Sequence, residues 1–531
     1  MKNYGGIYDA HLDVLPAELK KITHPKPIFR SSTIFPAFHF PGVTTRFLFM
    51  GYWIIKRHID QVGCVVTLRS LEGQVLNRSS FTVKKPKAYR IELASQLEEA
   101  HISLDKEFMG TLEIEVFSSV NLFFSFPAGV VNYYGPNFST YVHSAQRVFN
   151  DFEDMVKFSG KKGPESGFSI YADGNREPFI SLINGIEFVK DYSVQMEFLN
   201  KDNQSLKHEY KLGPLLPYQT HIIYPEREVD LQSFLKGSVG TVKVHHHLNW
   251  VYARLIVGNI RKNPPGLSIT HSFLDCTEFA SKMDYWKAAP SDWHAASLMV
   301  PLIQHHGRFT KMYFYPIYSP SEFSIDVEVY NAEGEKLASR EEVLCIVSPS
   351  LSIHEISFQA LCGELNMDTN MDLAARIIAT PKPGTLLPVR VKIGLDVGLD
   401  PNGLSCNICT NLYPFNPKLE TKPRTFRWLP IMMGQKNSST WITNSSAAVE
   451  YIREAHAELI FYREKDERTL SRKITIPPSG FKVIYPQKDP ELVEFLDNGI
   501  GWMVVKSSSP HANTYYFVEG SSGIVGGDHG F

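Results

Sequence analysis

The sequence predicts an all-β protein made of four tandem antiparallel β-sandwich repeats with short helical connectors. Three observations lead to this prediction. One order of features recurs four times along the 531 residues, the recurring runs alternate apolar and polar residues, and no long stretch has a helical period. Alternation with period two places one face of a strand in a core and the other in water. The spacing between equivalent turns, roughly 125 residues, fits the usual size of a domain.

Each copy begins with a strand, a polar turn, a second strand, a proline turn and a third strand. The polar turns consist of residues that tolerate turn geometry, and they are Glu72-Gly73, Asp202-Asn203, Glu333-Gly334 and Lys465-Asp466. The proline turns contain Pro86, Pro217, Pro349 and Pro477-Pro478. A leading strand precedes each copy, within residues 46–50, 179–183, 311–315 and 440–443.

Each copy then continues into a second half, in which a glycine precedes the last strand. Seven or so short strands in about 100 residues are typical of a β-sandwich. This order resembles the immunoglobulin-like and fibronectin-like sandwiches, although the Cys, Trp, Cys spacing of antibody domains is absent. The resemblance implies an architecture and no particular function. The expected division is an N-terminal extension, residues 1–33, followed by repeats at 34–150, 165–275, 293–416 and 425–531.

The connectors between the repeats have compositions of their own. We expect short helices within residues 145–158 and 275–286. Residues 416–424 contain Pro417, Lys422 and Pro423, which predicts an extended linker. Paired Gly526-Gly527 in the last strand predicts a bulge or a close approach of two backbones.

Composition excludes several classes of protein. The chain has 54 basic and 56 acidic residues and no basic stripe, so nucleic acid is not an expected partner. No apolar stretch is long enough to span a membrane, and the first residues do not read as a secretory signal. The default expectation is therefore a cytoplasmic protein, with export by a route that needs no N-terminal signal left open. Six cysteines are too sparse for a disulfide framework, and we expect no cofactor.

Three histidines occupy matching places in the last strands of copies one, two and four: His143, His271 and His529. Copy three has Asn407-Ile408-Cys409 instead. Imidazole both forms hydrogen bonds and binds metals, so these residues are candidate ligand-binding groups. The alternative is structural, with a ring nitrogen bonded to a backbone group at a strand end.

His245 and His247 form a candidate metal pair on the strand that follows Gly240. Residues i and i+2 of a strand point to the same face, so the two imidazoles can share an ion. A tetrahedral site needs one or two further ligands, which the sequence does not identify. An exposed polar face is the alternative.

Aromatic residues outside the repeated strands are candidate binding groups. Tyr133 and Tyr134 lie in an expected loop, and Trp286 and Trp293 lie in the connector between copies two and three. Tyrosine and tryptophan suit contacts with carbohydrate or protein, because they combine area with hydrogen bonding. Alternatively, these rings fill the joints between neighbouring repeats.

The sequence thus predicts a non-catalytic scaffold or binding module, with carbohydrate or another protein as its partner. No nucleophile motif or Cys-His signature indicates catalysis. One alternative is an enzyme whose site lies between repeats, which requires that the repeated histidines converge with a carboxylate. The other is a His-rich metal-binding protein. The oligomeric state does not follow from the sequence.

Overall fold

The computed structural model describes thirteen stretches of the chain. They are residues 27–150, 163–274, 286–287, 294–304, 307–316, 322–347, 352–385, 387–388, 391–399, 403–415, 425–431, 437–446 and 452–531. Strands predominate, and all the pairings between them are antiparallel in these stretches. The prediction of an all-β chain with antiparallel sheets is confirmed. In the described stretches, no helix has the length and apolar character needed to cross a membrane.

The first segment, residues 30–148, forms two sheets of the orders β1-β6-β3-β4 and β5-β2-β7-β8. Its strands are β1 Arg30–His39, β2 Thr44–Met50, β3 Val62–Ser70, β4 Val75–Val83, β5 Ala88–Glu92, β6 Phe108–Phe117, β7 Gly129–Gly135, β8 Phe138–Val142 and β9 Arg147–Val148. Its helices are α3 Tyr52–Arg57 and α4 Leu93–Glu99.

The second segment, residues 165–274, repeats this plan with the sheets β14-β13-β16-β10-β20 and β15-β12-β18-β19. Its strands are β10 Glu165–Ser166, β11 Ser169–Ile170, β12 Arg176–Ile183, β13 Val189–Leu199, β14 Ser205–Leu215, β15 Thr220–Ile223, β16 Gly240–His245, β17 Val251–Tyr252, β18 Ile256–Arg261, β19 Gly266–His271 and β20 Phe273–Leu274. Its helices are η1 Pro225–Arg227 and α6 Leu231–Leu235.

In the third segment, residues 286–415, the two sheets are joined into one of the order β25-β24-β27-β22-β30-β29-β23-β26. Its strands are β21 Trp286–Lys287, β22 His294–Leu302, β23 Phe309–Phe314, β24 Phe323–Tyr330, β25 Lys336–Ile346, β26 His354–Ser357, β27 Leu373–Pro381, β28 Leu387–Pro388, β29 Val391–Gly398 and β30 Cys406–Phe415. Its helix is α7 Phe358–Glu364.

The fourth segment, residues 425–529, forms the sheets β31-β36-β33-β34 and β35-β32-β37-β38. Its strands are β31 Thr425–Ile431, β32 Asn437–Asn444, β33 Ala455–Arg463, β34 Thr469–Ile476, β35 Phe481–Ile484, β36 Gly501–Ser507, β37 Ala512–Glu519 and β38 Val525–His529. Its helices are η4 Pro486–Lys488 and α9 Pro490–Leu496.

Helices α4, α6, α7 and α9 lie inside the segments, directly or a few residues after the strand that follows the proline turn. Buried leucines spaced i, i+4 fix three of them to the core: Leu93 with Leu97 in α4, Leu231 with Leu235 in α6, and Leu492 with Leu496 in α9. The side chains of Asp230, Ser357 and Asp489 cap α6, α7 and α9 by accepting a backbone N–H of the first turn.

The predicted helical connectors are therefore corrected where the structure describes them. Strand β9 replaces the expected helix at the start of 145–158, since it pairs with β17. Trp286 lies in β21 rather than in a helix. Residues 151–162, 275–285 and 416–424 lie outside the described stretches, as do residues 1–26 of the N-terminal extension.

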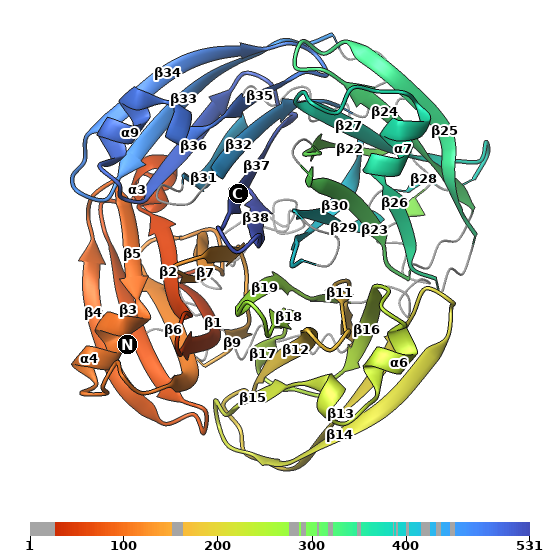
Figure 1. Ribbon diagram of the computed structural model, residues 1–531. Helices are drawn as coiled ribbons and strands as arrows, with labels where there is room; N and C mark the ends of the chain where they lie inside the picture. Colours follow the sequence, from red (N-terminus) through yellow and green to blue (C-terminus); the bar gives the residue numbers. More distant parts are fainter. Residues whose placement is uncertain are drawn as a thin grey trace, which may run out of the picture.

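The four segments form a closed ring, with the fourth segment beside the first (Figure 1). The predicted polar turns take part in the contacts between neighbouring segments. A Cβ atom on Gly73 would lie 2.2 Å from the Pro217 carbonyl oxygen, and one on Gly334 would lie 2.1 Å from that of Pro478. The last junction returns to the first segment, since Lys87 Nζ donates to the Glu464 carbonyl oxygen at 2.8 Å.

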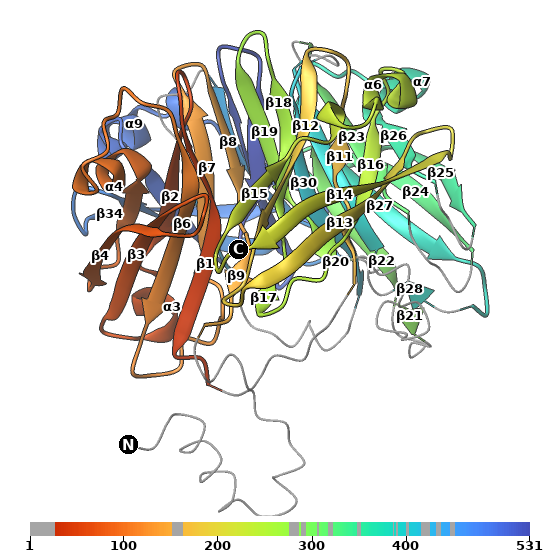
Figure 2. The same cartoon turned by 90° about the horizontal axis from the view of Figure 1, so that it is seen from below.

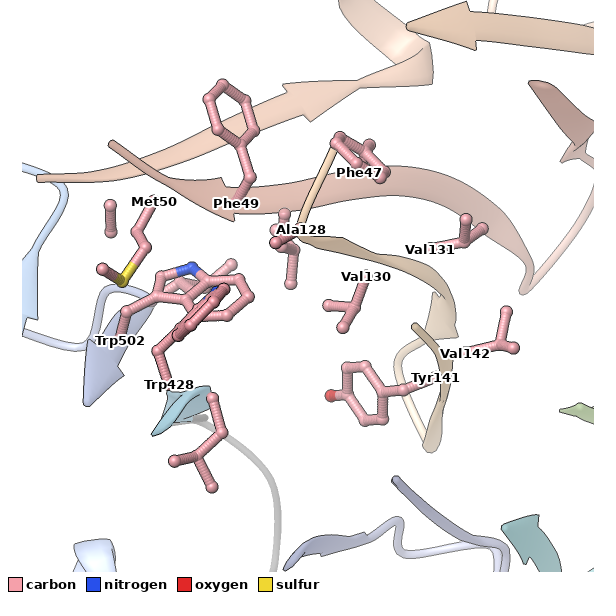
Figure 3. Close-up of a cluster of buried hydrophobic side chains, with 14 of the residues drawn as sticks. Phe47, Phe49, Met50, Ala128, Val130, Val131, Tyr141, Val142, Trp428 and Trp502 are labelled. Carbon is pink, nitrogen blue, oxygen red and sulfur yellow. The ribbon is translucent and has the colours of Figure 1, made fainter. Parts of the chain in front are cut away.

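The apolar core continues across the last junction. One cluster of buried side chains contains residues of both the first and the fourth segments. The ring of Trp428 in β31 stacks on Tyr52 in α3, with centroids 5.2 Å apart. Figure 3 shows Trp428 and Trp502 of the fourth segment beside Met50 and Ala128 of the first. A shared core makes the closure part of the fold rather than a surface contact.

Candidate functional site at the ring centre

Four strands, one from each segment, lie around the centre of the ring: β8, β19, β30 and β38 (Figures 1 and 2). Two contacts show how closely they pack. The backbone N–H of Ile269 in β19 donates to Thr140 Oγ1 in β8 at 3.3 Å. A Cβ atom on Gly526 in β38 would lie 2.0 Å from the Ser139 carbonyl oxygen. The close approach expected of the paired glycines is thus present at Gly526.

The three repeated histidines meet at this centre. His143 follows β8 directly, while His271 ends β19 and His529 ends β38. The His143 ring centroid lies 4.8 Å from that of His271 and 4.2 Å from that of His529. Sequence similarity placed the histidines at matching positions, and the closure of the ring brings those positions together.

Asp528 supplies a carboxylate to this group. Its Oδ2 accepts the backbone N–H of His143 at 2.8 Å and lies 3.0 Å from His143 Nδ1. Its Oδ1 accepts the backbone N–H of His529 at 2.7 Å. We call His143, His271, His529 and Asp528 the axial cluster. The convergence of histidines with a carboxylate, which the enzyme alternative required, is therefore present.

Each imidazole of the axial cluster uses Nδ1 as a donor. Nδ1 of His271 lies 2.8 Å from the Ser272 carbonyl oxygen, and Nδ1 of His529 lies 2.9 Å from that of Gly530. A carbonyl oxygen has no proton to give, so Nδ1 must carry the hydrogen. In a neutral ring Nε2 then keeps its lone pair. The buried Nε2 of His271 has no hydrogen-bond partner among the described residues.

Burial sets the charges of the cluster. It lowers the pKa of His271 well below the ordinary value, and the charges of Arg254 and His143 act in the same direction. Burial likewise lowers the pKa of His529 to about 4. Burial alone would raise the pKa of Asp528, but His143 and His529 hold it below its usual range. Near neutral pH, His271 and His529 are uncharged and Asp528 is ionised.

Access to the cluster from solvent is limited. His271 is 3% exposed, and the side chains of His143 and Asp528 are 13% and 6% exposed. In the third segment, Thr410 and Asn411 of β30 are buried as well. Such burial restricts the approach of an organic substrate from solvent.

The expectation that Tyr133 and Tyr134 lie in an exposed loop is wrong. Both residues lie in β7, which extends to Gly135. Tyr133 is fully buried and donates its hydroxyl to the Pro36 carbonyl oxygen at 2.6 Å. Tyr134 donates to Glu92 at 2.8 Å, beneath the guanidinium of Arg46. These contacts hold both rings within the first segment.

The proposed metal pair also differs from its expected geometry. Strand β16 ends at His245, so His247 lies beyond the strand and the i, i+2 argument does not apply. Nε2 of His245 lies 4.0 Å from Glu197 Oε2. Among the described residues, the group of three possible ligands that the structure brings together is His143, Asp528 and His529.

The connector tryptophans are described only in part. The backbone of Trp286 pairs with Pro388, and Trp293 lies outside the described stretches. Cys406 and Cys409 are buried in β30, and neither forms a disulfide.

A second polar group lies between the second and third segments, and sequence reasoning did not find it. Asp396 in β29 is 1% exposed and accepts hydrogen bonds from Asn407, Ser405 and Tyr171. Alternation along β29 places Asp396 on the polar face of the strand. That face is buried because the second segment covers it, a contact that no local pattern reveals.

A pocket of about 200 Å³ lies between the third and fourth segments. Its lining includes Arg308, Asn437, Trp441, Tyr485, Lys488 and Glu519. Arg308 forms an ion pair with Glu519, and Tyr485 donates to Asp372 at 2.6 Å. The pocket is separate from the axial cluster in its lining residues.

Comparisons with known proteins add no identification. No family model and no curated protein matches the chain. Among solved structures, the chain is similar to a tetra-tandem repeat from the extending region of a large adhesion protein, at 6% identity over 88% of this chain and 90% of that one. The TM-score is 0.09, so this likeness carries no argument about fold or function.

Proposed function

We propose that this protein is a non-catalytic ring scaffold that binds another protein. In this proposal it is built from four β-sandwich repeats of the immunoglobulin-like and fibronectin-like type, at residues 34–150, 165–275, 293–416 and 425–531. The recurrence of one strand order supports the repeat: β1-β6-β3-β4 in the first segment corresponds to β31-β36-β33-β34 in the fourth.

The observation that carries the proposal is the junction that closes the ring. Arg90 pairs with Glu464 at 3.2 Å, and Lys85 pairs with Glu467 at 2.7 Å. The stacked rings of Tyr52 and Trp428 lie in the core that the first and fourth segments share. Surface ion pairs contribute little by themselves, but a large apolar interface opposes relative motion of domains. A closed ring thus holds distant surfaces in fixed positions, as a scaffold requires.

An exposed apolar patch supports a protein as the partner. Phe123 is 50% exposed, Phe124 is 40% exposed and Val120 is 49% exposed, all in the connection between β6 and β7. The guanidinium of Arg57 lies 4.1 Å from the centre of the Phe123 ring. Contiguous exposed apolar groups beside cationic groups are typical of protein contacts.

Capture experiments with the full chain test this proposal. The double variant Phe123→Ser, Phe124→Ser should lose the captured protein, whereas Val75→Ser, at a 51% exposed position on β4, should retain it. A glycan array with the same chain distinguishes the partners. Binding to a glycan that is unaffected by the Phe123, Phe124 variant would favour carbohydrate instead.

An enzyme remains the second candidate, because the axial cluster combines histidines with a carboxylate. Catalysis would need a substrate to reach the imidazoles. Labelling of the full chain with diethyl pyrocarbonate measures this access, since the reagent modifies neutral imidazole. Slow labelling of His143, His271 and His529, relative to the exposed His247, is the result expected of a scaffold. Rapid labelling of all three would favour the enzyme.

A further inference from the structure

The three imidazoles of the axial cluster share an arrangement that is common around bound metals. Histidines that bind a metal usually donate their other ring N–H to a carboxylate or a carbonyl oxygen. Here Nδ1 of His143 is held by Asp528, and Nδ1 of His271 and of His529 by carbonyl oxygens. In the described part of the chain, none of the three Nε2 atoms forms a hydrogen bond.

A purely structural role explains only half of this arrangement. It accounts for the bonds from Nδ1, which satisfy backbone groups at the strand ends. It leaves the Nε2 atom of His271 buried without a partner among the described residues, and an unsatisfied buried polar group destabilises the folded state. A bound cation would use this lone pair.

The spacing of the rings is compatible with a shared ion. Two imidazoles that bind one zinc ion through Nε2, at about 2.0–2.1 Å each, have ring centres roughly 5 Å apart in tetrahedral geometry. The observed separations from His143 are 4.8 Å to His271 and 4.2 Å to His529. The ligand atoms that His143, Asp528 and His529 can offer lie within 4.8 Å of one another. His271 is not part of that group, so an ion bound by all three imidazoles would draw the His271 ring towards the other two.

The ligand atoms of the cluster define the class of ion. Asp528 contributes one negative charge, whereas Arg254 and Lys392 place positive charge near His271. Imidazole nitrogen suits zinc, copper, iron and nickel, while calcium and magnesium need a set of oxygen ligands. The ligand set therefore favours a divalent transition metal ion.

We propose that His143, His271 and His529 bind one divalent transition metal ion through Nε2, and that Asp528 orients His143 for this. The ion would join the first, second and fourth segments at the ring centre. This site goes beyond the scaffold function and does not depend on its partner: a ring that binds no metal would still present the apolar patch.

Zinc titration of the EDTA-treated full-length chain tests the site. We expect one Zn²⁺ per chain by calorimetry. His529→Gln should weaken zinc binding at least tenfold, and Asp528→Asn, which removes the orienting carboxylate, should weaken it 10- to 100-fold. The control is His247→Ala, an exposed histidine beyond the end of β16, which should bind zinc as the unmodified chain does.

A measurement on the unmodified chain covers the case in which a variant does not fold. Ring ¹⁵N chemical shifts report which imidazole nitrogen binds zinc, and we expect the Nε2 signals of His143, His271 and His529 to move. Unchanged signals for these three, equal zinc binding by a folded His529→Gln chain, or loss of zinc in His247→Ala would each overturn the proposal.

Discussion

Nδ1 of His143 lies 3.0 Å from Oδ2 of Asp528, although 385 positions separate the two residues in the sequence. The backbone N–H of His143 donates to the same carboxylate oxygen. One side chain thus bonds the end of β8 in the first segment to β38 in the last. This contact is polar and buried, unlike the exposed ion pairs at the outer part of the same junction. The contact therefore fixes how the end of β8 aligns with β38 where the ring closes, and the apolar interface adds to this.

Asp528→Asn should destabilise the metal-free chain. The amide keeps the size of the side chain but loses its charge and turns one acceptor into a donor, which leaves an N–H of His143 or His529 without an acceptor. We expect the free energy of unfolding to fall by about 1–3 kcal/mol, measured by urea denaturation. Asp202→Asn is the matched control, because Asp202 is 58% exposed and pairs with Lys236 on the surface. Equal losses in the two variants would contradict a special role for the buried contact.

Gly334→Ala tests the docking of a polar turn on the next segment. Gly334 has a φ of +81°, and its Cβ would meet the Pro478 carbonyl oxygen. The control is Gly213→Ala, with a φ of +71° and no atom within 4 Å of its Cβ. Both variants carry the backbone strain, about 1 kcal/mol, but only Gly334→Ala also disturbs a junction. We expect a larger fall of the thermal midpoint for Gly334→Ala, and equal falls would show that the contact adjusts without cost.

Local patterns predicted the strands and turns because each depends on a few neighbouring residues. The second positions of three predicted turns, Gly73, Asn203 and Gly334, have the positive φ that turn residues tolerate. The error at Tyr133 and Tyr134 has a local cause as well. A Gly-Pro-Asn turn follows them, and the prediction extended this turn backwards over the end of β7.

Contacts between segments could not be predicted in the same way. Repetition placed His143, His271 and His529 at equivalent positions, but their meeting depends on which faces of the segments pack together. The burial of Asp396 depends on the same packing. Asp528 gave no signal, because the residue directly before the histidine is Val142 in copy one and Thr270 in copy two, and neither is a carboxylate.

Trp428→Ala should weaken the closure of the ring. Trp428 is 3% exposed, stacks on Tyr52 and lies 4.3 Å from Lys56 Nζ. Removal of a buried tryptophan costs about 3–5 kcal/mol, since it leaves a cavity. The control is Ile452→Ala at an 86% exposed position, where we expect a change of less than about 0.5 kcal/mol. Hydrogen exchange should also rise in α3 of the first segment, and unchanged exchange there would argue that Trp428 stabilises only its own segment.

Asp396 should make stability fall as the pH rises through the acidic range. Burial raises its pKa from 3.8 to about 6, against hydrogen bonds from Asn407, Ser405 and Tyr171 and the charge of Lys311. Between about pH 4 and pH 6 the folded chain therefore holds a proton that the unfolded chain has lost, and ionisation costs the folded state free energy. Because the pKa of Asp396 is about 2 higher in the folded chain than in the unfolded chain, its ionisation lowers the free energy of unfolding by about 3 kcal/mol at neutral pH.

The variant Asp396→Asn removes this titration, so the comparison rests on slopes rather than on absolute stability. We expect the free energy of unfolding of the unmodified chain to decline relative to that of the variant from pH 4 to pH 6, and the difference to stay constant above pH 7. Urea denaturation at half-unit pH steps measures both curves. An Asn side chain also alters the hydrogen bonds to Asn407 and Tyr171, which displaces the whole variant curve without changing its slope. Parallel curves across this range would mean that Asp396 stays ionised in the folded chain, with Lys311 and the surrounding donors outweighing its burial.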